Sequence, residues 1–249
     1  MEKYTAIIIE PRIHQLFETV LNNFLSNLDE RWDFIIFHGH KNKEFLNELI
    51  NNNFQNHKNR ITLILLNINN INTSQYSKIL VNSKFYNYIP TEMFLIFQLD
   101  TLISDVYFNK IYDFLEYDYV GAPWFNLIEK IGYVGNGGIS LRRKSKMLEI
   151  INNTPYNDLN EDAFFSFYEG TINKPTFEKA KEFGVETIYY DKSFSIHKPF
   201  CYISSEQIAE IAKHISKIND LIIHYCYIEN NNNIFQEFDV IDNIDDVFI

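Results

Sequence analysis

The sequence predicts an α/β fold in which a mixed, mostly parallel β-sheet is flanked by helices. Short apolar runs of strand length alternate with segments whose apolar residues recur at helical spacing, a pattern typical of parallel sheets with helical connections. The chain has 249 residues, of which 46% are hydrophobic and 16% aromatic. A chain of this size and composition buries a large core, which excludes a disordered protein and a small disulfide scaffold.

The N-terminal half shows this alternation most clearly. Ala6–Ile9 is an uninterrupted apolar run that ends at Glu10 and Pro11, so we expect a buried strand there. His14–Leu28 follows with its apolar residues on one helical face. The same pattern predicts strands at 34–37, 61–66 and 93–97, and helices at 43–51 and 74–82.

The C-terminal half is less regular. A strand is expected over Tyr117–Ala122, before the dense glycine cluster at 135–138. Gly184 ends a helix at Phe183, because glycine is common just beyond the last helical turn. The other expected elements are helices at 144–151, from 161 onward and at 206–218, a strand at 185–190, and a loop or short strand at 194–199.

Composition changes near Tyr227. The run Asn230–Asn233 follows, and residues 229–249 contain six Asp or Glu but neither Lys nor Arg. Apolar residues between these charges make the segment amphipathic. We therefore expect one domain over residues 1–227 and an acidic, Asn-rich tail over residues 228–249. A hypothesis that stays open is that this tail binds another protein and the domain only supports it.

Charge and cysteine content exclude several classes of function. The formal net charge is −11, and no Lys/Arg cluster forms a stripe, so nucleic acid is not expected as a partner. No apolar run reaches 18 residues, so no membrane span is expected. Cys201 and Cys226 match no metal or redox spacing, which favours a reducing, cytoplasmic location. The excess of Asn, Ile and Lys indicates an AT-rich genome.

The strongest strand leads directly into Gln98-Leu99-Asp100. In open α/β sheets, ligands bind beyond the carboxyl ends of the strands. An Asp at this position can bind Mg²⁺ or Mn²⁺, which prefer oxygen ligands and leave positions for phosphate and water. The alternative is that Asp100 caps the segment that follows.

A second candidate is the acidic pair Glu161 and Asp162, which begins a predicted aromatic-rich helix. One of the two carboxylates can act as a general base. The alternative is that both simply stabilise the first helical turn, where the helix dipole favours negative charge.

Four further candidates are ligand contacts. Glu10 and Arg12 follow the first strand, where Arg12 can pair with phosphate or form a surface salt bridge. The loop of Asn136, Gly137 and Gly138 lets the backbone approach a sugar or phosphate closely. The remaining two candidates are His197, a possible ligand of Mn²⁺, and Trp124, which can stack on a sugar or pack in the core.

Two long segments carry a resemblance to a known family. They are YDYVGAPW at 117–124 and GNGGISLR at 135–142. With them the chain resembles an uncharacterised glycosyltransferase-like domain, a domain of unknown function, over roughly residues 5–205. The other matching stretches, in family order, are 9–12, 37–39, 97–100, 160–162, 186–188 and 197–199.

That family is similar to GT-A glycosyltransferases, so the resemblance implies a GT-A-like (Rossmann-like) fold. By the same resemblance Asp100 and His197 hold a Mn²⁺ or Mg²⁺ ion, and Asp162 with Glu161 beside it forms the catalytic pair. Gln98 stands where the Asp-x-Asp metal motif has its first Asp, which removes one negative charge. This departure leaves weak metal binding, or transfer without a metal, as open possibilities.

The resemblance implies transfer of a sugar from a nucleoside diphosphate donor to an acceptor hydroxyl, with inversion at the anomeric carbon. The acceptor is an unknown glycan, protein or small molecule. The alternative is a catalytically degenerate module that binds a carbohydrate or a nucleotide sugar. The expected donor contacts are Glu10, Arg12, Gln98 and Asp100, and the expected acceptor contacts are Trp124, Asn136, Gly137 and Gly138.

Overall fold

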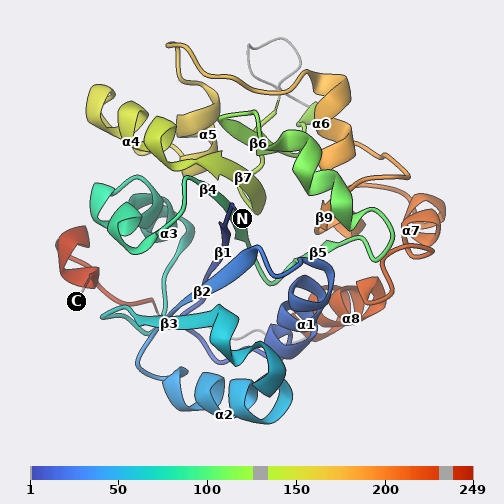
Figure 1. Ribbon diagram of the computed structural model, residues 1–249, viewed down its shortest axis with the longest axis horizontal. Helices are drawn as coiled ribbons and strands as arrows, with labels where there is room; N and C mark the ends of the chain where they lie inside the picture. Colours follow the sequence, from blue (N-terminus) through green and yellow to red (C-terminus); the bar gives the residue numbers. More distant parts are fainter. Residues whose placement is uncertain (1, 126–133, 230–237, 249) are drawn as a thin grey trace.

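A computed structural model describes residues 2–125, 134–229 and 238–248 (Figure 1). A six-stranded sheet with the order β3-β2-β1-β4-β7-β6 forms its centre. β7 runs antiparallel to both of its neighbours, and the other neighbouring pairs are parallel. This topology confirms the predicted mixed, mostly parallel sheet. The strands are β1 (Tyr4–Ile9), β2 (Trp32–His38), β3 (Ile61–Leu65), β4 (Met93–Phe97), β6 (Tyr119–Gly121) and β7 (Ile139–Arg143).

Helices cover both faces of this sheet, which explains why its strands are continuous apolar runs. Alternate strand residues point to opposite faces, so Ile8 and Ile36 join one core while Ile7 and Ile35 join the other. No helix in the described ranges is long and apolar enough to cross a membrane. The first core packs against α1 (Phe17–Asn27), α2 (Lys43–Asn53), α7 (Ser205–Ile211) and α8 (Ile218–Ile222), and the second against α3 (Thr73–Leu80), α4 (Lys144–Asn153) and α5 (Glu161–Ser166).

A second, three-stranded sheet has the order β5-β9-β8. The strands are β5 (Thr101–Ile103), β8 (Gly184–Val185) and β9 (Ser195–His197), and α6 (Phe177–Phe183) leads into β8. β5 follows β4 after a short turn and pairs antiparallel with β9, with Thr101 opposite His197. This register places the late histidine beside the end of the strongest central strand.

Two secondary-structure predictions are wrong. The strand expected over 185–190 is limited to Gly184–Val185, because its partner β9 is itself only three residues long. The helix expected over 206–218 is interrupted between α7 and α8. There the loop after β5 binds the backbone: the amide of Asp105 donates to the carbonyl of His214 at 2.8 Å, and the Asp105 carboxylate accepts from the Ser216 amide at 2.8 Å.

The described part of the C-terminal segment, residues 238–248, lies beside α3 and the outer strand β3 (Figure 1). Phe248 forms an antiparallel bridge with Leu66, just beyond β3. A short 3-10 turn, Ile244–Val247, packs on α3, and Val247 is buried. This segment thus pairs with the chain just beyond the outer strand of the sheet.

Candidate functional site

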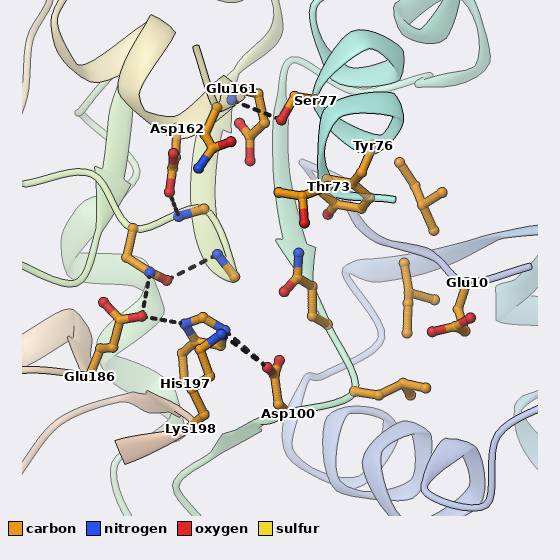
Figure 2. A pocket seen from close by; sticks show the side chains of 18 of the residues that line it. Glu10, Thr73, Tyr76, Ser77, Asp100, Glu161, Asp162, Glu186, His197 and Lys198 are labelled. Carbon is orange, nitrogen blue, oxygen red and sulfur yellow. Dashed lines mark hydrogen bonds and ion pairs between the residues drawn. The ribbon is translucent and has the colours of Figure 1, made fainter. Parts of the chain in front are cut away.

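A cavity of about 740 Å³ lies beyond the carboxyl ends of β1 and β4 (Figure 2). The parallel strands end at the same edge of the sheet, and ligands bind at this edge in open α/β folds. Each residue singled out from the sequence lines this cavity, although the role assigned to it stays a prediction. They are Glu10, Arg12, Gln98, Asp100, Trp124, Asn136, Gly137, Gly138, Glu161, Asp162 and His197.

Asp100 and His197 form an ion pair on the floor of the cavity. Nε2 of His197 lies 3.2 Å from Oδ2 of Asp100, and the pairing of β5 with β9 brings His197 opposite Thr101, the residue after Asp100. Burial alone lowers the pKa of His197, but the carboxylates of Asp100 and Glu186 outweigh it and raise this pKa to about 9. Burial raises the pKa of Asp100, and the charges of His197 and Lys198 overcome it, so this pKa lies below its ordinary value.

Lys198 brings a second positive charge to the same carboxylate. Its Nζ lies 3.8 Å from Oδ2 of Asp100, and its amide donates to the Asp100 carbonyl at 2.9 Å. The backbone of Lys198 is left-handed, with φ at 32°, a conformation that costs about 1–2 kcal/mol for a residue with a side chain. Such strain concentrates at functional sites.

Glu186 joins the glycine-rich loop to His197, and it is absent from the sites predicted from sequence. Its Oε1 accepts from Nδ2 of Asn136 at 2.8 Å and lies 3.0 Å from Nδ1 of His197. Oδ1 of Asn136 accepts from the amide of Gly138 at 3.0 Å. Glu186 therefore orients the imidazole and the loop together. The signal in the sequence is its place at the start of the family-like stretch 186–188, directly after Gly184–Val185, and that stretch assigned no role to it.

The absence of a side chain at Gly138 makes room for His197. A Cβ at this position would overlap the imidazole ring, whereas a Cβ at Gly184 would come no closer than 3.1 Å to Oγ of Ser195. We expect Gly138→Ala to lower the free energy of unfolding by about 1–3 kcal/mol, because the ring must move. Denaturant unfolding measures the loss, with Gly184→Ala as the control. Equal losses in the two variants would contradict this assignment.

Asp162 lies at the start of α5, with its carboxylate turned toward the glycine loop (Figure 2). Its Oδ2 accepts from the amide of Gly137 at 3.2 Å, and its Oδ1 accepts from the amide of Ala163 at 2.7 Å. Burial raises the pKa of Asp162 above its ordinary value, although these two hydrogen bonds act to lower it. A buried carboxylate with a raised pKa is suited to accept a proton near neutral pH.

Glu161 also lines the cavity, and it pairs with Arg142 of β7. Its Oε2 lies 2.7 Å from the Arg142 guanidinium, and the Arg142 side chain is 0% exposed. Burial alone lowers the pKa of Arg142, but Glu161 outweighs it and keeps this pKa above its usual value. The guanidinium also lies over the rings of Tyr119 and Phe165. This pair anchors the first turn of α5 and therefore the position of Asp162.

Glu10 and Arg12 bind each other at the wall of the cavity opposite Glu186 (Figure 2). The Arg12 Nε and one terminal nitrogen each donate to a different carboxylate oxygen of Glu10 at 2.8 Å. The side-chain amide of Asn42 donates to the Glu10 carbonyl at 2.8 Å and to the Arg12 carbonyl at 3.0 Å. The loop after β1 is thus held in place at the rim of the cavity.

Helix α3 and Trp124 complete the walls. Thr73, Tyr76 and Ser77 of α3 line the cavity and were not predicted from sequence, because nothing in the pattern of a short amphipathic helix distinguishes them. Trp124 is half-buried, and its ring centroid lies 6.1 Å from that of Phe167. One face of the cavity is therefore aromatic.

The donors at Asp100 and His197 fit a divalent cation that shares its coordination with a ligand. Oδ1 of Asp100 is buried and has no hydrogen-bond partner among the described residues. Glu186 on Nδ1 of His197 is the type of carboxylate that orients a metal-binding histidine. In the described part of the chain, no group of three or more His, Cys, Asp or Glu is arranged to hold a metal. A cation here would take its other ligands from phosphate and water, as Mg²⁺ commonly does.

Solved structures with similar folds include glycosyltransferases. The apo bifunctional glycosyltransferase WbbM matches 88% of this chain with a TM-score of 0.50 and 12% identity, and this chain covers 51% of the WbbM chain. GlyE from Streptococcus pneumoniae TIGR4 matches 90% of this chain and 64% of its own, with a TM-score of 0.49 and 9% identity. HddC from Yersinia pseudotuberculosis, complexed with GMP-PN, matches 84% of this chain and 99% of its own, with a TM-score of 0.48 and 14% identity.

At these identities the similarity shows the fold alone, and the likeness to WbbM agrees with the predicted α/β class. No curated protein sequence matches the chain at a significant level. A family model matches residues 60–202, within the stretch that the sequence motifs indicated. This match spans more than half of the chain and includes β4, the glycine-rich loop, the acidic pair and His197. The chain belongs to the family described as protein of unknown function DUF5672.

Proposed function

We propose that the chain is a glycosyltransferase that moves a sugar from a nucleoside diphosphate donor to an acceptor hydroxyl. The observation that carries this proposal is that Asp162 and the Asp100–His197 pair line one cavity at the carboxyl ends of parallel strands. A general base and a site for a diphosphate are the two groups that such a transfer needs. The likeness of the fold to a glycosyltransferase supports it.

In this proposal Asp162 accepts the proton of the acceptor hydroxyl. The acceptor oxygen then forms a bond to the anomeric carbon while the bond from that carbon to the diphosphate oxygen breaks. The diphosphate leaves with the bonding electron pair. Attack from the face opposite the leaving group inverts the anomeric configuration.

Asp100 and His197 would hold Mn²⁺ or Mg²⁺ on the diphosphate side. When bound, the ion supplies positive charge that stabilises the departing diphosphate. Lys198 adds a fixed positive charge near the same carboxylate. Gln98 contributes a neutral amide at this wall, so the protein provides less negative charge to a cation than two aspartates would.

The two ends of the cavity suit the two substrates. Glu10, Arg12 and the cavity face of α3 would contact the donor nucleotide, beside Gln98 and Asp100. Trp124 and the loop of Asn136, Gly137 and Gly138 would contact the acceptor, beside Asp162. The amide of Gly137 already bonds the carboxylate of Asp162, so the acceptor loop and the base are held together.

A second candidate function is a degenerate module that binds a nucleotide sugar without transferring it. Gln98 favours this candidate, because it leaves Asp100 as the only carboxylate in the sequence Gln98-Leu99-Asp100. The two functions differ in one result. A transferase consumes donor sugar when a metal and an acceptor are supplied, and a binding module does not.

Binding of a donor is tested by a thermal-shift screen with UDP-, GDP- and CMP-sugars, each with and without Mn²⁺. A donor at about 100-fold its Kd stabilises the fold by about 2.7 kcal/mol, which raises Tm by about 5–10 °C. We expect Asp100→Ala to abolish the part of this shift that depends on Mn²⁺. Asp33→Ala, which removes an exposed carboxylate paired with Lys3, is the control. A Mn²⁺-dependent shift that survives in Asp100→Ala would contradict the metal assignment.

A further inference from the structure

The C-terminal strap, defined here as residues 238–248, is bound along one wall of the cavity. Beyond the bridge between Phe248 and Leu66, the amide of Asn67 donates to the carbonyl of Val247 at 2.9 Å. The strap therefore follows the loop that connects β3 to α3. That loop ends in Ile71 and Asn72, which line the cavity.

Asp239 makes the contacts at the first end of the strap. Its Oδ2 accepts from the amide of Asn69 at 2.6 Å, and its own amide donates to the carbonyl of Asn70 at 3.3 Å. Its carbonyl accepts from the side-chain amide of Gln75 at 2.6 Å. One residue of the strap thus holds both the loop and the first turn of α3.

Gln75 is also the residue that closes the N-terminal cap of α3. Its Oε1 accepts from the amide of Asn72 at 2.9 Å, while Oδ1 of Asn72 accepts from the amide of Gln75 at 2.9 Å. This reciprocal arrangement is a capping box, which determines where a helix begins. The Gln75 side chain therefore joins the cap of α3 to the strap.

Helix α3 transmits this placement to the proposed catalytic carboxylate. Thr73, Tyr76 and Ser77 line the cavity, and Oγ of Ser77 accepts from the amide of Glu161 at 3.2 Å. Glu161 begins α5, and Asp162 follows it directly. Continuous contacts thus run from Asp239 through Gln75 and α3 to the first turn of α5. Figure 2 shows the last of them, between Ser77 and Glu161.

The second end of the strap is anchored separately. Oδ1 of Asp245 accepts from the side-chain amide of Asn82 at 2.8 Å, and Oδ2 lies 3.2 Å from Nζ of Lys84. Phe248 stacks on Tyr88 with ring centroids 6.1 Å apart. These contacts attach the strap to the 3-10 helix Ser83–Tyr88, away from the cap of α3.

We propose that the strap is a positioning element for the site, in which Asp239 acts through Gln75 to place α3 and the first turn of α5. Removing the bond between Asp239 and Gln75 loosens the cavity wall without removing any residue that lines it. The expected change in the position of α3 and the first turn of α5 follows from these contacts alone. The effect on catalysis rests on the proposed transferase function.

The variant Gln75→Glu removes the bond between Gln75 and the strap but keeps the bond between Gln75 and Asn72. A glutamate keeps an oxygen to accept from the Asn72 amide, but it has no N–H to donate to the Asp239 carbonyl. Asp239→Ala removes the bond to Asn69, and Asp239→Asn keeps an oxygen to accept it. Asp245→Ala is the matched control, because it loosens the strap only at its other end.

Hydrogen exchange followed by mass spectrometry measures placement in the full chain, without any ligand. We expect Gln75→Glu and Asp239→Ala to raise exchange in 72–80 and in 161–166 by about threefold to tenfold, the effect of one lost hydrogen bond. Asp239→Asn and Asp245→Ala should leave exchange in 161–166 at the wild-type rate. Faster exchange confined to the strap, or equal changes in Asp245→Ala and Gln75→Glu, would overturn the proposal.

The kinetic measurement uses the nucleotide sugar that is consumed in the presence of Mn²⁺. We expect Gln75→Glu to raise KM for the donor by about threefold to tenfold and Asp245→Ala to leave it unchanged. An unchanged KM and kcat in Gln75→Glu, with faster exchange in 161–166, would overturn the role in catalysis. If the wild type consumes no donor while the exchange pattern appears, the proposed function fails and the positioning by the strap stands.

Discussion

Asp162→Asn lowers the rate of sugar transfer by about 10²–10⁴-fold and leaves donor affinity nearly unchanged, if Asp162 is the general base. Asparagine can keep its oxygen toward the amide of Gly137, which joins α5 to the glycine loop, and then loses only the bond from the amide of Ala163. It cannot take a proton from the acceptor. The loss should therefore appear in kcat, measured as donor sugar consumed per unit time.

The pH dependence of the same reaction gives an independent check. Burial raises the pKa of Asp162, and the ionised carboxylate is the active form. The rate therefore rises with pH through that raised pKa, and acid inhibits at a higher pH than for an exposed aspartate. In Asp162→Asn this fall in rate at acidic pH should disappear. Asp158→Asn, at an exposed position, is the control, and full turnover in Asp162→Asn would show that another group is the base.

Arg142→Met lowers the free energy of unfolding by about 3–5 kcal/mol, the largest stability effect that we expect in this chain. Arg142 is fully buried, and its guanidinium lies 2.7 Å from the carboxylate of Glu161. Methionine fills similar space and packs on Tyr119 and Phe165, but it leaves Glu161 buried without its cation. Chemical denaturation measures the change.

The double variant Arg142→Met/Glu161→Gln distinguishes a buried charge from a loss of packing. Replacing both partners removes the uncompensated charge, so we expect it to recover most of the lost stability. Arg143→Met is a control at the next position, where the guanidinium is partly exposed and pairs with Asp118. If the double variant is as unstable as Arg142→Met, the packing of Arg142 matters more than its charge.

Much of the fold follows from local sequence. The run Met93–Phe97 is apolar throughout and is buried on both faces of a central strand, as its composition indicates. The helix predicted from residue 144 begins there because apolar spacing and a preceding strand agree. The single helix predicted over 206–218 is interrupted, because Asp105, which is distant in sequence, binds the backbone of His214 and Ser216.

The residues of the candidate site also fall into two groups, those that the sequence indicates and those that only the structure reveals. Asp100, Asp162 and His197 are recognisable in the sequence because each belongs to a distinct motif, and the structure brings them to one cavity. Glu186 belongs to a family-like stretch to which no role was assigned, and Gln75 belongs to no motif. Their importance comes from hydrogen bonds to residues far away in the chain, which no local pattern records.

The sequence by itself determined the α/β class, the boundaries of most central elements and which residues carry reactive groups, because strand and helix patterns and motifs are local properties. Tertiary structure decided how those groups are paired. It placed His197 beside Asp100 through the register of β5 and β9, and it turned Glu161 toward Arg142 while Asp162 faces the glycine loop. It also placed the strap on the cap of α3. These pairings depend on burial and on contacts between segments that are distant in sequence, so they arise only when the chain is folded.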